Sequence, residues 1–173
     1  MIYSMVPVPE DDEFLELLWE DVIRDGRLKL VFYDGGVMTV EDFIPFIRSP
    51  KRLCLLATKK DEEGIYPADY KVGLAWLDRF EQYSARLHFT IIGKYQRSIG
   101  EALVRFLLEK TKLKVVWGCT PESHVLALRV VRSLGFTLLG GIPNLCNLYY
   151  EDRLVPGVIS YFNLEGGRNG RKR

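Results

Sequence analysis

One stretch of the chain combines an apolar run, a basic polar turn and the start of a helical pattern. Residues 91–103 read IIGKYQRSIGEAL, and Gly100 lies where the helical pattern begins. Backbone N–H groups at a helix start have no partner within the helix, and the helix dipole adds positive charge there. Such a turn can hold a phosphate or pyrophosphate, and Lys94 and Arg97 would add full charges. An ordinary strand-to-helix turn is the alternative for this feature alone.

His88 is the residue best suited to take a proton. It lies in the segment 85–92 (ARLHFTII), where His88 and Thr90 alternate with apolar residues. In a strand this alternation turns His88 to the face opposite the apolar row. Because a histidine can accept a proton from an ammonium group near neutral pH, we interpret His88 as a candidate general base. A hydrogen-bonded histidine packed on a sheet face is the alternative.

A second pattern lies further along the chain, at residues 124–136 (HVLALRVVRSLGF). Its apolar spacing predicts a helix that ends at Gly135, a residue type that adopts the left-handed conformation at helix ends without strain. Phe136 then begins a strand. A capping glycine followed by a core aromatic explains this pattern without any functional role.

The composition is that of an ordinary globular protein. The chain has 173 residues, of which 47% are hydrophobic and 27% charged. Lys and Arg number 24 against 23 Asp and Glu, which gives a formal net charge of +1. Four of the positive charges lie in residues 168–173, so the remainder is mildly acidic. This distribution argues against a specific nucleic-acid partner.

The chain has few residues that bind metals or form disulfides. Its three cysteines are widely spaced and it has two histidines, so we predict reduced thiols and no metal site. No apolar stretch approaches the ~20 residues that cross a bilayer. The N-terminus lacks the basic start and apolar run of a signal peptide. We therefore predict a cytoplasmic protein with no membrane attachment.

Hydrophobic periodicity predicts strands and helices along the whole chain. Thr39, with Asp42 three residues later, resembles a capping box at a helix start. The connection at residues 81–82 is so short that the strands on either side of it must be antiparallel. The predicted elements are a strand at 2–8, helices at 10–24 and 39–49, strands at 52–58, 71–80 and 85–92, a helix at 100–111, a strand at 114–119, a helix at 120–134, and strands at 136–140 and 155–163.

The order β-α-α-β-β-β-α-β-α-β-β predicts an α+β fold with a single central mixed sheet flanked by helices. The middle of the sheet is expected to be antiparallel, with helical crossovers later. No repeat or composition change divides the chain. Residues 1–165 are therefore expected to form one domain, and residues 166–173 (GGRNGRKR) a flexible basic tail.

Together, the two motifs and this element order resemble the GNAT superfamily of N-acetyltransferases. Residues 97–102 (RSIGEA) match the pyrophosphate-binding pattern of that family, Gln/Arg-x-x-Gly-x-Gly/Ala. Residues 134–136 match its Leu-Gly-Phe, and Ala127 lies where the family usually has alanine. The resemblance spans most of the chain, from the first strand to the last.

The resemblance implies a binding site for acetyl-CoA. The backbone of Ile91 and Ile92 would bind the pantetheine arm, and His124 takes the place of a family asparagine at the cofactor site. The fourth and fifth strands would splay apart and place residues 117–119 beside the thioester. Gly100 would leave the space that the phosphates fill. The backbone amides of the phosphate cradle would come from Arg97, Ser98, Ile99, Gly100, Glu101 and Ala102.

The resemblance also implies direct attack of an amine on the acetyl group, with no covalent enzyme intermediate. Family members often protonate the departing thiolate with a tyrosine, at a position where this chain has Val131. Cys119, Tyr149, Tyr150 and Tyr161 are alternative candidates for that acid. His88 remains the candidate base, with Asp78 and Glu81 as weaker alternatives. The acceptor would be a small-molecule or peptide amine, and a homodimer is left open.

The main prediction is an acyl-CoA-dependent N-acetyltransferase, and two other functions are alternatives to it. Val131 and the lack of an evident base would also suit a catalytically silent protein of the same fold, which serves as a binding or structural component, for example in a phage or multiprotein assembly. A nucleotide-binding protein is a weaker alternative, because the sequence has neither a P-loop nor the Gly-x-Gly-x-x-Gly of dinucleotide folds.

Overall fold

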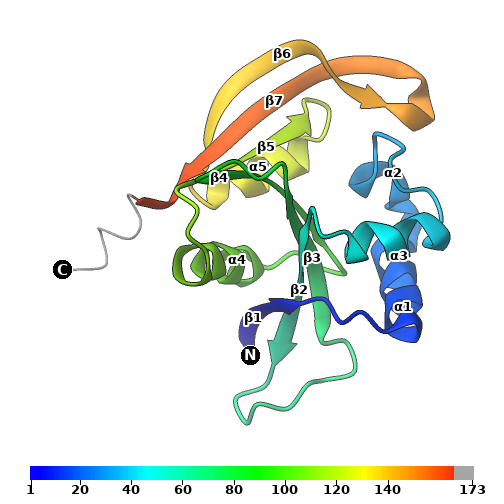
Figure 1. Cartoon of the computed structure of the whole chain (residues 1–173), viewed down its shortest axis with the longest axis vertical. Helices are drawn as coiled ribbons and strands as arrows, with labels where there is room; N and C mark the ends of the chain where they lie inside the picture. Colours follow the sequence, from blue (N-terminus) through cyan, green and yellow to red (C-terminus); the bar gives the residue numbers. More distant parts are fainter. Residues whose placement is uncertain (166–173) are drawn as a thin grey trace.

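The computed structural model describes residues 1–165, so the predicted basic tail at 166–173 lies outside the described residues. The elements follow the predicted order, with three short helical turns added (Figure 1). They are β1 (Ile2–Pro7), α1 (Asp12–Ile23), η1 (Arg24–Gly26), α2 (Leu28–Val31), α3 (Val40–Arg48), β2 (Leu53–Lys60), β3 (Lys71–Asp78), β4 (Ser84–Ile91), α4 (Arg97–Lys110), β5 (Val115–Pro121), α5 (Val125–Ser133), β6 (Thr137–Leu148), η2 (Tyr149–Glu151) and β7 (Arg153–Asn163).

The strands form one seven-stranded sheet in the order β1-β2-β3-β4-β5-β7-β6. Every neighbouring pair is antiparallel except β4 and β5, which are parallel and joined through α4. The sheet is therefore mixed, and the predicted α+β class is confirmed. No helix in residues 1–165 is long and apolar enough to cross a membrane.

Two apolar clusters cover opposite faces of the sheet. On one face, α1 and α3 bury Leu15, Leu18 and Phe43 against alternate residues of β2 and β3, including Trp76. On the other face, α4 buries Ile99, Leu103 and Leu107 against the intervening residues, such as Leu55 and Leu77. Figure 1 shows α1 and α3 on one side of the sheet and α4 on the other. This alternation follows from the two-residue period of a strand.

Two helix starts differ in how well the sequence predicted them. Thr39 and Asp42 form the expected capping box at the start of α3, since each side chain bonds to the backbone of the other residue. The predicted helix start at Thr120 and Pro121 is wrong. These residues end β5 and pair with Val158 and Gly157 of β7, so α5 begins only at Val125.

The C-terminal hairpin is longer than the sequence indicated. β6 runs through residues 140–144, which the apolar pattern left between strands, and the chain turns at η2 instead. The register between β6 and β7 shifts at two places, Leu138/Gly141 and Ile142/Cys146. Extra residues at these shifts break the alternation of side chains, so the strand pattern is hidden in the sequence.

Candidate active site

The parallel pairing of β4 with β5 stops after three residue pairs. The register joins Ser84–Arg86 of β4 to Val115–Trp117 of β5, and beyond Arg86 the strands separate. A cavity of about 570 Å³ occupies the opening. The predicted splaying of the fourth and fifth strands is thus present, and no side chain among residues 1–165 fills the gap.

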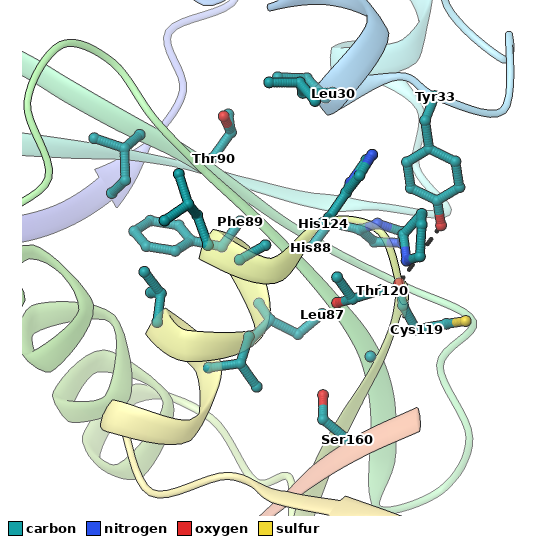
Figure 2. A pocket seen from close by; sticks show the side chains of 18 of the residues that line it. Leu30, Tyr33, Leu87, His88, Phe89, Thr90, Cys119, Thr120, His124 and Ser160 are labelled. Carbon is teal, nitrogen blue, oxygen red and sulfur yellow. Dashed lines mark hydrogen bonds between the residues drawn. The ribbon is translucent and has the colours of Figure 1, made fainter. Parts of the chain in front are cut away.

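The cavity reaches both faces of the sheet. Leu30 and Tyr33, from the segment around α2, line it on one face, and residues of α5 line it on the other. Figure 2 shows Leu30 and Tyr33 above the opening, with Ser160 of β7 at the far end. Two different reactants could therefore enter from opposite sides of the sheet.

Alternate residues of β4 offer backbone groups to the cavity. The N–H of Ile92 donates to the carbonyl of Val72 on β3, at 3.0 Å. In an antiparallel ladder this bond turns the even-numbered residues of β4 toward β3 and the odd-numbered ones toward the gap. Phe89 and Ile91 therefore face the opening with backbone groups that β5 no longer reaches.

This register corrects the predicted pantetheine contacts. The backbone of Ile92 belongs to the β3 ladder, and Ile92 does not line the cavity. The carbonyl of Ile91 accepts a hydrogen bond from Arg27 at 2.6 Å, and a second Arg27 nitrogen donates to the carbonyl of Gly93 at 3.2 Å. Phe89, which sequence reasoning did not single out, is the residue with open backbone groups at the middle of the gap.

The start of α4 lies beside the same cavity and offers backbone donors. Gln96 occupies the N-cap position without capping, since its side chain accepts from the hydroxyl of Tyr3. Among residues 1–165, no acceptor reaches the backbone N–H groups of Arg97 and Ser98. These two donors, together with the helix dipole, can bind an anion.

The phosphate cradle is smaller than the sequence predicted. Because α4 begins at Arg97, the N–H groups from Gly100 onward, including those of Glu101 and Ala102, donate within the helix. The N–H of Ile99 donates to the carbonyl of Gln96 at 3.0 Å. The predicted contribution of residues 99–102 is therefore wrong, since the helix starts three residues before the glycine.

Gly100 serves packing and does not leave space for phosphates. It is buried, and a Cβ atom at this position would lie 2.6 Å from each Cδ atom of Leu134. The glycine thus admits the side chain that follows α5. The predicted empty space at Gly100 is already filled by the protein itself.

His88 lines the cavity on the face that α2 covers. Its ring stacks on Trp76 with centroids 4.7 Å apart and an interplanar angle of 7°. Its Nε2 is buried and has no hydrogen-bond partner among residues 1–165, and the nearest carboxylate oxygen, Oδ1 of Asp78, lies 3.7 Å away. The alternative of a histidine satisfied by hydrogen bonds therefore does not describe this nitrogen.

An ion pair between Asp78 and Arg86 lies next to His88. Arg86 donates two hydrogen bonds of 2.7 Å to the two carboxylate oxygens of Asp78. Burial raises the pKa of Asp78, but the hydrogen bonds and charge of Arg86 and the neighbouring His88 together outweigh burial and hold that pKa well below its usual range. Asp78 is thus an anion near His88 and can stabilise a protonated imidazole.

Cys119 lies in the cavity wall and contacts a second thiol. Its Sγ is 3.4 Å from the Sγ of Cys146, and both sulfurs lie over Gly157, where a Cβ atom would be 2.8 and 2.7 Å from them. The hydroxyl of Tyr33 donates to the Cys119 carbonyl at 3.5 Å. Burial raises the pKa of the Cys119 thiol to about 12, so this group keeps its proton at neutral pH.

The other predicted residues fall in different places. His124 lines the cavity at the start of α5, with its ring at 90° to that of Tyr33 and a pKa lowered by burial. Val131 also lines the cavity, at the position where the related family often has tyrosine. Tyr149, in η2, does not line the cavity, and its ring packs over Gly35. Within the described part of the chain, no cluster of three metal-ligating side chains occurs.

Sequence reasoning missed two residues that close the site. Arg27 and Tyr33 flank α2 and reach the backbones of β4 and β5 from the same segment. Neither residue lies in a recognisable motif, because the contact depends on a four-residue helix that has no periodic signature. Only the strands that they touch were predicted.

No protein-family model matches this sequence, and no curated protein is significantly similar to it. Solved structures are similar in fold. Spermidine N-acetyltransferase from Vibrio cholerae, in complex with CoA and spermine, superposes with a TM-score of 0.72 at 10% identity, over 94% of this chain and 96% of that one. A GNAT-family acetyltransferase from Bacillus anthracis has a TM-score of 0.71 at 14% identity, over 95% and 96%.

A third similar structure is the Salmonella typhimurium acetyltransferase that modifies the N-terminal serine of ribosomal protein L7/L12. It has a TM-score of 0.73 at 10% identity, over 94% of this chain and 95% of that one. These values place the fold of this chain among the GNAT acetyltransferases, as the sequence motifs predicted.

Proposed function

We propose that the protein transfers an acetyl group from acetyl-CoA to a primary amine. The observation that carries this proposal is the early end of the β4–β5 pairing, which leaves an apolar opening through the sheet. Open backbone groups of Phe89 in the gap and open N–H groups of Arg97 and Ser98 at the start of α4 suit a pantetheine chain and a pyrophosphate, respectively. A protein that only packs its sheet would gain nothing from these unpaired groups.

In this proposal His88 prepares the acceptor. Its imidazole takes a proton from the ammonium form of the amine, and the Asp78 carboxylate, 3.7 Å from the buried Nε2, stabilises the resulting imidazolium. The neutral amine then forms the new C–N bond at the thioester carbonyl while the C–S bond breaks, and the second proton of the amine, released in this step, replaces the proton that the acid gives to the thiolate. Stacking on Trp76 fixes the orientation of the His88 ring.

The departing thiolate requires a proton. Val131 cannot supply one, and Tyr149 lies outside the cavity. Cys119 is better placed, because this residue lies in the cavity wall and burial keeps its thiol protonated. Cys119 is therefore our candidate acid.

Calorimetric titration with acetyl-CoA tests the donor site. We expect micromolar binding, about −8 kcal/mol. Arg97→Glu should weaken it about tenfold or more, because a carboxylate at the first helical residue competes for the same N–H groups. Lys110→Glu is the matched control, since this exposed residue carries the same charge at the opposite end of the same helix. Equal affinity in all three proteins would refute the placement of the phosphates.

Release of free thiol from acetyl-CoA in the presence of amines tests the transfer itself. Turnover would establish an acetyltransferase. Tight binding of acetyl-CoA without turnover for any amine would instead favour the catalytically silent alternative, which Val131 in the cavity wall supports.

A further inference from the structure

A strap over the opening defines the acceptor side of the cavity. Residues 27–33 are held at both ends, by Arg27 on the carbonyls of Ile91 and Gly93 and by Tyr33 on the carbonyl of Cys119. The backbone carbonyl of Tyr33 also accepts from the N–H of Tyr149, at 2.8 Å. The strap is therefore fixed to β4, to β5 and to the C-terminal hairpin at once.

The strap presents apolar side chains to the opening. Leu30 and Val31 line the cavity opposite Trp76 and His88, and Leu30 is 59% exposed. Figure 2 shows Leu30 and Tyr33 on the same side of the opening. An acceptor that enters here would meet aliphatic and aromatic surface around the side chain of His88.

None of the described residues lines this cavity with a carboxylate. The nearest acid behind His88 is Asp78, and both of its oxygens are bound by Arg86. Of the titratable side chains in the lining, Arg27 is cationic, and burial lowers the pKa of His124 and so favours its neutral form. Asp34 and Glu151 act electrostatically on Tyr33 and His124, but neither carboxylate belongs to the lining. A second ammonium group on the acceptor would therefore lose its hydration here without gaining an anionic partner in the cavity wall.

We propose that the acceptor is a small primary monoamine carried on an apolar group, with no second positive charge. This inference rests on the proposed acetyl transfer and narrows it. It separates this chain from the polyamine acetyltransferase that its fold resembles, because a polycation needs carboxylates that this cavity does not have.

Hexylamine and 1,6-diaminohexane form a matched pair of probes, since they differ mainly in one terminal ammonium group. We expect kcat/KM for hexylamine to exceed that for 1,6-diaminohexane by about tenfold or more, because the unpaired charge must be desolvated. Among linear monoamines, each additional buried methylene should raise kcat/KM about fourfold until the cavity is filled. Calorimetry with the CoA-bound protein should give the same order of affinities without requiring turnover.

Leu30→Asp places a carboxylate on the strap. It should raise kcat/KM for 1,6-diaminohexane relative to kcat/KM for hexylamine, with the affinity for acetyl-CoA unchanged. Leu17→Asp is the control, because Leu17 lies half-exposed on α1 and does not line the cavity. Preferred binding of the diamine by the wild type, or binding of neither amine, would overturn the proposed acceptor class. Preferred binding of hexylamine without thiol release would support the acceptor class while contradicting acetyl transfer.

Discussion

Gly100 of α4 lies in direct contact with Leu134, the residue that follows α5. A Cβ atom on Gly100 would stand 2.6 Å from both Cδ atoms of Leu134, closer than non-bonded carbons approach. The two sequence motifs, the turn with Gly100 and the Leu-Gly-Phe with Leu134, thus meet in space. Their joint occurrence reflects a packing contact between α4 and the end of α5.

This contact predicts a specific coupling between two substitutions. Gly100→Ala should lower the free energy of unfolding by about 1 kcal/mol, because overpacking costs about 1–3 kcal/mol and replacing a helical glycine returns about 1 kcal/mol. In a Leu134→Ala background the clash is absent, so the same change should stabilise the protein or leave it unaffected. Urea denaturation of the four proteins measures the coupling. An identical effect of Gly100→Ala in both backgrounds would contradict the contact.

The ion pair behind His88 predicts a loss of stability in acid. Asp78 has a lowered pKa when folded, so the unfolded chain takes up its proton first as the pH falls below about 4. The unfolded state then binds more protons than the native state, and stability falls with pH. We expect the free energy of unfolding to decrease more steeply between about pH 4 and 2 in the wild type than in Asp78→Asn. Parallel curves for the two proteins would show that Asp78 is not held as an anion.

Buried thiols predict slow alkylation of the native protein. Burial raises the pKa values of Cys54 and Cys119 to about 12, and only the thiolate reacts with iodoacetamide. At pH 8 both residues should react on the order of 10³-fold more slowly than a free cysteine. Mass spectrometry of digested peptides measures the labelling, with urea-denatured protein as the control. Rapid modification of Cys119 in the native state would place its thiol outside the packed wall.

The same two thiols predict alkaline destabilisation. Their pKa values are raised on folding, so between about pH 9 and 12 they stay protonated in the native state and ionise in the unfolded one. The native state then binds more protons, and the free energy of unfolding falls as the pH rises. Cys54→Ala should flatten this dependence. A curve of unchanged slope would contradict the assigned burial of Cys54.

His88 predicts a change in the pH dependence of catalysis. His88→Gln keeps a polar side chain of similar length but cannot take up a proton. We expect kcat to fall by about 10²-fold or more, with the affinity for acetyl-CoA retained, because proton transfer by a positioned base contributes roughly 10²–10⁴-fold. The pH–rate profile should also lose the limb that a histidine base contributes between about pH 5 and 8. A normal profile in His88→Gln would remove His88 from the reaction.

Most of the fold could be predicted from the sequence, because its signals are local. The period of two in residues 85–92 and the capping box at Thr39 and Asp42 depend on neighbours along the chain, and both were predicted correctly. The boundary at Thr120 and Pro121 was not, since a pair that resembles a helix start is held in β5 by its ladder with β7. Long-range pairing overrode the local preference there.

The candidate site also has features that the sequence predicted and features that it did not. Sequence alone determined that a glycine-containing helix start follows a strand, and that His88 faces away from the apolar row. The tertiary structure decided that Leu134 packs against Gly100 and that α4 begins at Arg97. It also decided that Arg27 donates a hydrogen bond to the carbonyl of Ile91. Helices and strands follow from interactions a few residues apart, whereas an opening in a sheet and the groups that face it exist only after distant segments have packed together.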